Sequence, residues 1–338
     1  MRPNSRRTAG LAARFAAARA AAFAAGILLA AATAGQAQEF PAKPVRVITP
    51  FAAGNTLDQA LRIVSDRIKD AGGQPLVIDN KPGGAGFIAA QAGAQAAPDG
   101  YTLLLAGSGM MVINPHTFSK LPYDPEKSYR PVTNFLGTAL VLAAHPSLPA
   151  NTLAELVAHA RTNPGKVSFA SFTAGNSSHF AGVLFNRRAG IDMLHVPFNG
   201  TPPAVQNLVG GQVNTAFLPL LAVKPHVDAG RVKLLAVTSD RRTPLAPAVP
   251  TFEESGYPDL TIFTWAALLA PAGTPDALIG RLNAEFTRAL RSDEVRDKFR
   301  AMDFVPMPTT PEEFSAYMRR DSLRWQEAVR LSGFKASE

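Results

Sequence analysis

Short runs of β-branched residues alternate with segments of helical periodicity from Pro41 onward, and this alternation limits the fold more than any other feature of the chain. Strands separated by helices are typical of α/β proteins with mainly parallel sheets. A chain of 338 residues exceeds what one hydrophobic core usually serves, so we expect two domains. The expected strands are 45–50, 76–79, 101–106, 140–144, 167–171, 214–218, 234–238 and 262–269, and the expected helices are 56–71, 85–96, 152–163, 178–189, 202–209 and 221–229.

Charge and cysteine content exclude several classes of protein. Five arginines and no acidic residue fall within residues 1–37, so the net charge of +8 for the whole chain becomes +3 for the 301 residues that follow. A nearly neutral chain argues against nucleic acid as a partner, because nucleic-acid binding needs a basic surface on the folded domain. The sequence has no cysteine, which excludes disulfides, thiolate metal sites and a cysteine nucleophile.

The first 37 residues have the features of an export signal. Basic residues are followed by an apolar run at 20–34, shorter than the roughly 20 residues that a membrane span needs. Small residues stand at Gly35 and Ala37. We therefore expect cleavage after Ala37 and a mature protein that starts at Gln38 in the periplasm. A retained membrane anchor is the alternative, and the Arg6-Arg7 pair leaves twin-arginine export open.

Four turns rich in glycine and hydroxyl groups, at 50–58, 107–109, 173–179 and 199–203, follow expected strands or open expected helices. In open α/β sheets, ligands bind at the carboxyl ends of strands, where helix N-termini present N–H groups to an anion. Each turn alone is more simply an ordinary helix cap, whereas four at equivalent places favour a binding site. The candidate ligand-binding residues are Phe51, Ala53, Gly54, Asn55, Asp58, Ser108, Met110, Thr173, Asn176, Ser178, His179, Asn199, Gly200 and Thr201, with Phe217 and Pro219 at the end of a further strand.

Signatures of catalysis and of cofactors are weak or missing. No serine after residue 37 has G-x-S-x-G spacing, and the six histidines lack H-x-H and H-E-x-x-H spacing. The segment 84–89 matches a dinucleotide-binding fingerprint, but we interpret it as a tight turn that opens a helix. We therefore expect no enzyme, no metal and no cofactor. His179 either caps and packs or contacts a ligand, and Asp58 is either a solvated first-turn acid or part of the pocket.

Several further segments carry recognisable motifs in order. They are Pro44-Val-Arg-Val-Ile-Thr-Pro-Phe-Ala-Ala-Gly54 with Asp58, Asn80-Lys-Pro-Gly-Gly-Ala-Gly86, Pro98-Asp-Gly-Tyr-Thr-Leu-Leu104, Gly175-Asn-Ser-Ser-His179, His195-Val-Pro-Phe-Asn-Gly200 with Gly210-Gly-Gln-Val213, Pro225-His226 through Leu235-Ala-Val-Thr-Ser239, and Pro250-Thr-Phe-Glu-Glu-Ser-Gly-Tyr257. From about Pro41 to the end, the chain resembles the Bug (TctC-like) substrate-binding proteins of tripartite tricarboxylate transporters.

The resemblance implies a two-lobed, Venus-flytrap periplasmic binding fold. In such a fold a small organic carboxylate is held between the lobes by backbone amides, hydroxyls and ordered water. Lobe 1 would comprise about 38–139 and 263–338, and lobe 2 about 140–262. The resemblance also implies delivery of the ligand to integral-membrane transporter subunits, and we expect a monomer. A receptor for a membrane signalling protein is the alternative, and a periplasmic hydrolase is a weaker one.

The sequence departs from the family pattern at three positions. Asn55 stands where a second glycine is usual, Asn199 where a lysine or similar residue is usual, and Leu218 where a polar residue, often aspartate, is common. None of the four turns contains lysine or arginine, so we expect an anion site built from backbone amides. Asp58 is the only acid in these turns, and Met110, Phe217 and Leu218 are apolar. This favours unaminated carboxylates over amino acids, because a buried ammonium group needs a partner.

Overall fold

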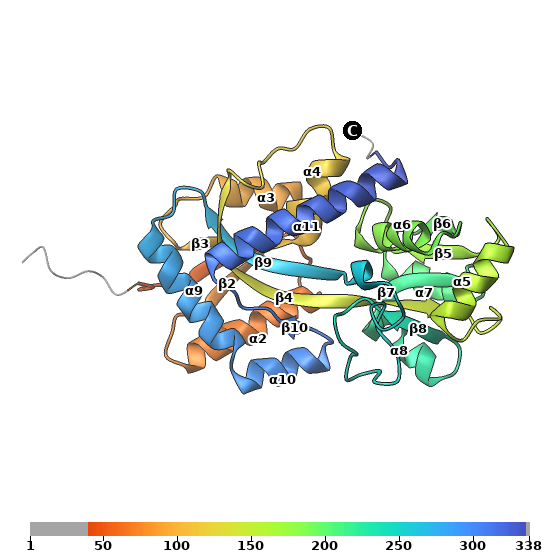
Figure 1. The fold of residues 1–338 in the computed structure, drawn as a ribbon. Coiled ribbons are helices and arrows are strands. Elements are labelled where there is room, and N and C mark those ends of the chain that lie inside the picture. Colours follow the sequence, from red (N-terminus) through yellow and green to blue (C-terminus); the bar gives the residue numbers. More distant parts are fainter. Residues whose placement is uncertain (1–39, 336–338) are drawn as a thin grey trace, which may run out of the picture. The chain divides into compact units, whose positions relative to one another are not determined.

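A mixed sheet of ten strands organises the computed structural model of the protein, which describes residues 40–335. The strand order is β2-β1-β3-β9-β4-β7-β5-β6, and β8 and β10 also pair with β4 (Figure 1). The expected signal peptide lies outside the described residues. The strands are β1 (Val45–Thr49), β2 (Leu76–Asn80), β3 (Thr102–Gly107), β4 (Tyr129–Ala144), β5 (Ser168–Ser171), β6 (Leu194–Pro197), β7 (Thr215–Pro219), β8 (Lys233–Val237), β9 (Phe263–Pro271) and β10 (Val305–Pro306).

The α/β class is confirmed, but the sheet is mixed rather than mainly parallel. β1 pairs in parallel with β2 and β3, and β5 pairs in parallel with β6 and β7. β9 runs antiparallel to β3 and β4, and β4 runs antiparallel to β7 and β8. β1 and β3 therefore run in the direction of β4, whereas β5, β6 and β7 run against it. The carboxyl ends of β1 and β3 consequently point toward the carboxyl ends of β5, β6 and β7. The predicted turns that follow these strands therefore face each other.

β4 is one continuous strand that serves two groups of neighbours. Its residues 129–139 pair with β9, and its residues 140–144 pair with β7 and β8. The sequence predicts a strand only at 140–144, because Thr133 and Asn134 interrupt the apolar pattern. Both are buried, and both form hydrogen bonds with Thr309. The Thr133 hydroxyl donates to the Thr309 carbonyl (3.0 Å), and the Asn134 N–H donates to the Thr309 hydroxyl (3.1 Å). The lobe boundary at 139–140 stays a prediction, and the change of pairing partners lies at the same place.

Helices begin where the sequence supplies caps. Asn55 and Asn176 accept N–H groups at the first turns of two helices, Thr152 accepts the Glu155 N–H, and Thr310 forms a capping box. The helices are α2 (Thr56–Asp70), α3 (Phe87–Ala94), α4 (Asn114–Thr117), α5 (Leu153–Thr162), α6 (Ser177–Ala189), α7 (Thr201–Val209), α8 (Leu220–Asp228), α9 (Asp276–Leu290), α10 (Asp293–Ala301) and α11 (Pro311–Ser332), with short turns of helix η1 (Gly84–Gly86), η2 (Gly109–Ile113) and η3 (Pro258–Leu260).

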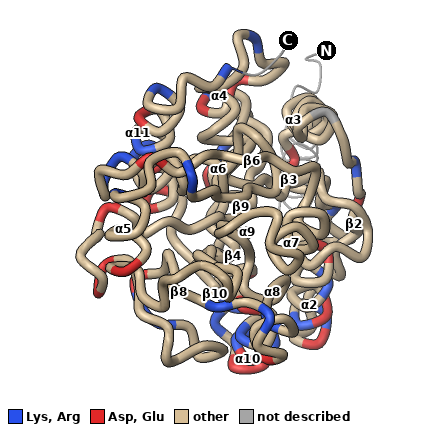
Figure 2. Tube along the Cα trace, turned by 90° about the vertical axis from the view of Figure 1, so that its right-hand side faces the viewer, with Lys and Arg blue, Asp and Glu red and all other residues tan. Residues whose placement is uncertain are grey.

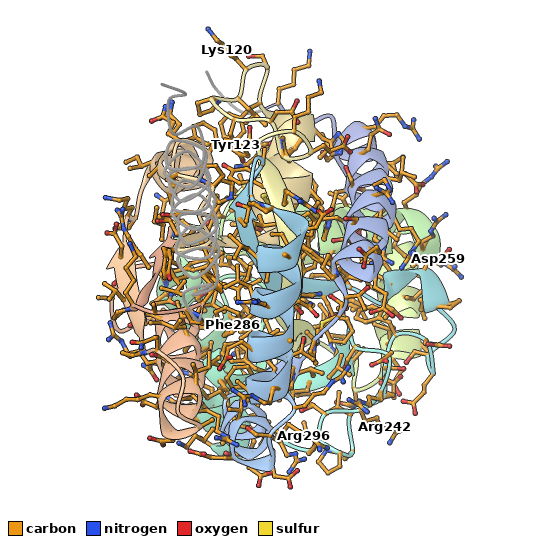
Figure 3. All side chains as sticks on the ribbon, turned by 90° about the vertical axis from the view of Figure 1, so that its left-hand side faces the viewer. Lys120, Tyr123, Arg242, Asp259, Phe286 and Arg296 are labelled. Atoms are coloured by element: carbon orange, nitrogen blue, oxygen red, sulfur yellow. The ribbon has the colours of Figure 1, made fainter. Side chains whose placement is uncertain are left out.

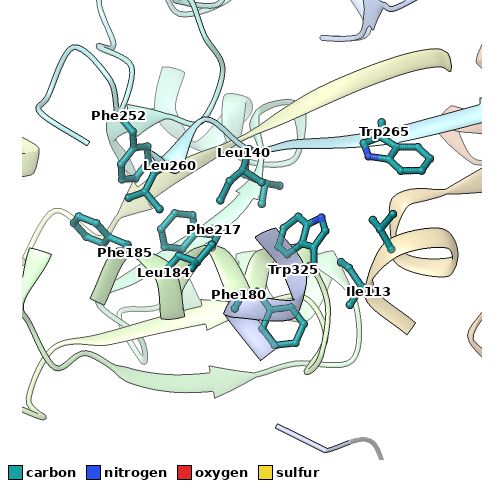
Figure 4. Packing of buried hydrophobic residues seen from close by; sticks show 14 of the residues in the cluster. Ile113, Leu140, Phe180, Leu184, Phe185, Phe217, Phe252, Leu260, Trp265 and Trp325 are labelled. Atoms are coloured by element: carbon teal, nitrogen blue, oxygen red, sulfur yellow. The ribbon is translucent and has the colours of Figure 1, made fainter. Parts of the chain in front are cut away.

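One hydrophobic cluster extends beneath both groups of strands. Phe217 packs against Phe185 and stacks on Phe252, and Phe180 contacts Trp325 of α11 (Figure 4). α11 contacts β4, α6 and η2, so the last long helix closes the cluster along both groups of strands (Figure 1). Burial of this size is the main favourable contribution to folding.

A buried carboxylate on α11 holds both tryptophans of the chain. The indole N–H groups of Trp265 and Trp325 donate to Asp321 Oδ2, at 2.7 Å and 3.0 Å. Asp321 is 4% exposed, and Arg324 lies 3.6 Å from its other oxygen. Burial raises the pKa of Asp321, although the two indoles and Arg324 oppose the rise. The contact ties α11 to β9 through paired polar groups inside an apolar core.

Candidate functional site

The first predicted turn is shaped by the carboxylate of Asp58. Its Oδ2 accepts hydrogen bonds from the Gly54 N–H (2.9 Å) and Arg62 Nε (3.0 Å), and its Oδ1 accepts one from Asn80 Nδ2 (3.0 Å). Asn80 also donates to the Phe51 carbonyl (2.9 Å). Asp58 is 1% exposed, so the reading of a solvated acid is wrong. Burial raises its pKa, but the donors from Arg62, Asn80 and Gly54 outweigh burial and hold the pKa below its usual value.

Residues on the surface of this turn remain open to solvent. Ala53, Gly54 and Asn55 are exposed, and Phe51 is half-buried. Gly54 has a φ of 79°, which favours glycine. The Asn55 side chain is the N-cap of α2 and accepts the Leu57 N–H (2.8 Å). The asparagine at the position where a second glycine is usual in the family therefore caps α2.

The second turn follows β3 and holds a buried hydroxyl without a partner. Ser108 is 1% exposed, and its Oγ makes no hydrogen bond among the described residues. The chain continues from Ser108 into η2, a π-helical turn of the kind often found at functional sites. A methyl group at Gly107 would lie 3.4 Å from Phe51 Cζ, so the first and second turns are in contact. Met110 is 5% exposed and packs behind this surface against Gly86.

The third turn, between β5 and α6, is held by its own polar groups. Asn176 Oδ1 accepts the Ser178 N–H (3.0 Å), the His179 N–H (3.3 Å) and the Ser178 hydroxyl (3.0 Å). The Ser178 hydroxyl accepts the Phe172 N–H (3.1 Å). Asn176 and Ser178 are thus committed to capping α6, whereas Thr173 at the tip is exposed.

His179 and His195 form a stacked pair beneath this turn. Their ring centroids are 3.8 Å apart with planes at 10°, and the Gly175 N–H donates to His179 Nδ1 (3.2 Å). The Ser171 hydroxyl lies 2.7 Å from His195 Nε2. Burial, together with the neighbouring His195, lowers the pKa of His179 to about 3, and burial lowers the pKa of His195 to about 4. Both rings are neutral at physiological pH, and the packing alternative for His179 fits this geometry.

The fourth turn joins the third through one backbone contact. The Gly200 N–H donates to the Phe172 carbonyl (2.7 Å), and Gly200 has a φ of 110°, which side chains with a Cβ rarely adopt. Asn199 is exposed and Thr201 is half-buried at the start of α7. Pro202 and Pro203 have no N–H, so the N-terminus of α7 offers fewer free backbone N–H groups to an anion than a helix without prolines there.

The end of β7 contributes less than expected to an open surface. Phe217 is 1% exposed within the aromatic core, and Leu218 is fully buried in a cluster on another part of the sheet. Only Pro219, half-buried at the start of α8, remains partly accessible at this strand end. The side chains of Phe217 and Leu218 therefore pack the core.

Strand β9 brings the two pairs of turns to one place. Gly107 pairs in register with Ala266, and two residues earlier the Thr264 hydroxyl donates to Ser177 Oγ (3.0 Å). The turns after β3 and β5 therefore contact a single short stretch of β9. Sequence reasoning missed Thr264, because it treated 262–269 only as a strand. The available signal is a hydroxyl residue within an otherwise apolar run.

Metal binding has no support in the part of the chain that the structure describes. Residues 40–335 contain no group of three or more histidine and acidic side chains that could hold an ion. Within the same residues, no helix is long and apolar enough to cross a membrane.

Comparison with known proteins identifies the family. The sequence profile of the family described as "Tripartite tricarboxylate transporter family receptor" (TctC) matches residues 60–333. The chain belongs to this family. BugT of Bordetella pertussis is 34% identical to this TctC receptor over 300 residues, which cover 88% of this chain and 92% of BugT. The predicted resemblance to Bug proteins is confirmed.

Two solved structures of relatives contain carboxylates. A protein of R. palustris solved with adipate is 30% identical, has a TM-score of 0.75, and covers 88% of this chain and 99% of its own. MatC of Rhodopseudomonas palustris with bound malate is 32% identical, has a TM-score of 0.69, and covers 86% of this chain and 100% of its own. Other solved structures that share the fold of this TctC receptor are periplasmic binding and transport proteins. The prediction of a two-lobed periplasmic binding fold is confirmed, and these relatives are solute-binding proteins.

Proposed function

We propose that this TctC receptor captures a small organic carboxylate between its two lobes and delivers it to the membrane subunits of a tripartite transporter. The convergence of the turns on β9 beside the unpartnered Ser108 hydroxyl is the observation that carries the proposal. Relatives solved with adipate and malate support the ligand class. The expected processing after Ala37, the periplasmic location and the monomeric state belong to the same proposal. Mass spectrometry of a periplasmic fraction tests the cleavage site.

The predicted site residues divide by what their polar groups already do. We assign ligand contact to the exposed residues, to half-buried residues without a side-chain hydrogen bond, and to the unpaired Ser108. We assign positioning to the buried or half-buried side chains whose polar atoms hold a turn. Asn55 is exposed and is kept among the contacts, although it also caps α2. Met110 and Phe217 pack behind the surface and are left out of the contacts. The proposed contacts are Phe51, Ala53, Gly54, Asn55, Ser108, Thr173, Asn199, Gly200, Thr201 and Pro219, and the proposed positioning residues are Asp58, Asn176, Ser178 and His179.

Among these turns the only carboxylate is already occupied. Asp58 is paired with Arg62, and no other acid lies in the four turns. A buried ligand ammonium group would therefore lack a partner, which is costly. We expect succinate to bind more tightly than aspartate by about tenfold or more. Isothermal titration of the mature protein with the two acids measures the difference, and tighter binding of aspartate would contradict the expectation.

Changing Gly200 to valine is expected to weaken carboxylate binding by about tenfold or more. The left-handed backbone at Gly200 excludes a β-branched side chain, and the shift would move the contact between the third and fourth turns. Gly230→Val is the matched control, because Gly230 has a φ of 67° on an exposed turn after α8. Both variants should lose about 1–3 kcal/mol of stability, but only the first should lose affinity. Titration of both variants with malate or adipate measures the affinities, and equal affinities of Gly200→Val and Gly230→Val would overturn the proposed site.

Asp58→Ala is expected to weaken binding through the first turn. Without the carboxylate, the Gly54 N–H loses its acceptor and the Asn80 amide keeps only the Phe51 carbonyl, so residues 51–55 lose a contact that fixes them. We expect about a tenfold loss of affinity and faster hydrogen exchange at Gly54. Asp66→Ala removes the same charge from an exposed position on α2 and should change neither quantity. Unchanged exchange at Gly54 in Asp58→Ala would refute the positioning role.

A further inference from the structure

A cavity of about 680 Å³ lies apart from the four turns and is enclosed by two distant segments. One wall is the loop 239–244, which follows β8. The other wall comes from the end of α9, α10 and β10. Ala139 and Phe263, the last residue pair of the antiparallel β4–β9 ladder, line the cavity between the two walls. Its volume falls in the range of small-molecule sites, roughly 300–1,000 Å³.

Arginines are the main charged residues in the lining of this cavity. Five arginines contribute to it, against the two acids Asp240 and Asp303, and we call it the arginine pocket. Arg242 and Arg296 lie toward the same end of the molecule (Figure 3), and positions occupied by Lys or Arg cluster along the trace near α10 and β10 (Figure 2). The arginines are Arg241 and Arg242 on the loop, and Arg291, Arg296 and Arg300 on the opposite wall.

The acidic partners of these arginines stand outside the lining. Arg242 pairs with Glu254 (2.9 Å), and Arg296 and Arg300 pair with acids three residues earlier on α10 (3.3 and 2.9 Å). All of these pairs are solvent-exposed, so each contributes little energy. A guanidinium group has five donors, and such pairs leave several of them available. Among the described residues, Arg241 and Arg291 form no ion pair, and they come from opposite walls.

One of the two acids in the lining, Asp303, is hydrogen-bonded across the pocket. The Thr243 hydroxyl donates to Asp303 Oδ1 (2.9 Å), which links the loop 239–244 to the turn between α10 and β10. Asp303 has a φ of 55°, a left-handed conformation that is rare for residues other than glycine. Burial raises the pKa of Asp303, although Thr243 opposes the rise. This hydrogen bond joins the two walls, and five arginines against two acids leave the lining with an excess of positive charge.

We propose that the arginine pocket binds a multivalent oxyanion that carries two or more phosphate or carboxylate groups. Planar guanidinium groups recognise such groups by paired hydrogen bonds, and cations from two walls match an anion with two charged ends. The occupant contacts both the loop after β8 and the helices α9 and α10, so it braces these segments against each other. The site is separate from the turns on β9, and the proposal does not depend on the ligand captured there.

Titration of the mature protein with pyrophosphate tests the proposal, with citrate as a second probe. Arg241→Ala with Arg291→Ala removes one unpaired guanidinium from each wall and should weaken pyrophosphate binding by about tenfold or more. Arg231→Ala with Arg281→Ala is the matched control. It removes the same charge from two exposed arginines outside the pocket and should change affinity by less than about twofold.

The two probes separate the possible sources of the anion. Citrate binding that is lost in the pocket variant and kept in Gly200→Val shows that the pocket accepts carboxylates as well as phosphates. Citrate binding that is lost only in Gly200→Val restricts the pocket to phosphate compounds. Equal losses of pyrophosphate affinity in the two double variants would reduce the effect to net charge and overturn the proposal. Absence of pyrophosphate binding at about 1 mM would overturn it as well.

Discussion

Replacing Asp321 with alanine is expected to lower the free energy of unfolding by about 3–5 kcal/mol. The substitution leaves the indole N–H groups of Trp265 and Trp325 without their acceptor inside the core, and each unpaired donor carries its full desolvation cost. It also opens a space between α11 and β9. Urea unfolding followed by far-ultraviolet circular dichroism measures the loss.

Asp321→Asn is the control for this prediction. The amide keeps an oxygen in the position of Oδ2 and removes the charge that burial disfavours, so most of the stability should remain. The near-ultraviolet spectrum provides a second measurement, because both tryptophans of the chain contact this carboxylate. A loss below about 1 kcal/mol in the alanine variant would show that water or another group satisfies the indoles.

Mild acid is expected to destabilise the protein through the stacked histidines. The folded pKa values of His179 and His195 are about 3 and about 4, below the ordinary value of 6.5 that applies to the unfolded chain. Between these values the unfolded state binds more protons, so the stabilisation present above pH 6.5 is lost as the pH falls toward about 4. With two rings, the free energy of unfolding falls by at most about 2.7 kcal/mol per pH unit. Urea midpoints between pH 7 and pH 5 measure it.

One histidine can be removed from the pair without losing the turn. In His179→Gln, the side-chain oxygen can still accept the Gly175 N–H, and only His195 titrates. The slope should fall by about half, to roughly 1.4 kcal/mol per pH unit. His145→Gln, at a half-buried ring away from the pair, should leave the slope unchanged. An unaltered slope in His179→Gln would mean that other groups cause the acid sensitivity.

Most strands and helices were predictable from the sequence, because their periodicity and caps are local. The short elements β6, β10, α4 and α10 were not predicted, and neither was the long first part of β4. Thr133 and Asn134 look like turn residues, and their place in a buried strand depends on Thr309, which is distant in the sequence. The mixed direction of the sheet was missed for a similar reason, since β9 returns alongside β4 only after the chain has built β5 to β8.

The positions of the candidate turns were predictable, but it was not predictable which of their polar side chains hold the turn and which stay available for a ligand. Asn176 and Ser178 have the composition of anion-binding residues, yet their oxygens cap α6 and hold the Phe172 N–H. The sequence left Asp58 open between a solvated first-turn acid and a pocket residue. Arg62 follows four residues later on the same helix and could be paired with it by spacing, but the contact with Asn80 on β2 could not. Partners contributed by other elements decide whether a polar side chain remains available, and a single sequence contains no record of those partners.

The pairing of β9 with the first part of β4 has a consequence for how a gene of this kind can be recombined. The chain leaves β4 at residue 144, builds β5 to β8, and returns at residue 263 to pair with residues 129–139 of β4. The strands and helices that bear the third and fourth turns, β5 to α8, are therefore encoded by one uninterrupted fragment. Exchange of codons 140–262 between two genes would transfer half of the proposed binding surface in a single step, while the first and second turns stayed with the recipient. In the proposed site, such a fragment would carry the ligand contacts of the third and fourth turns separately from those of the first and second.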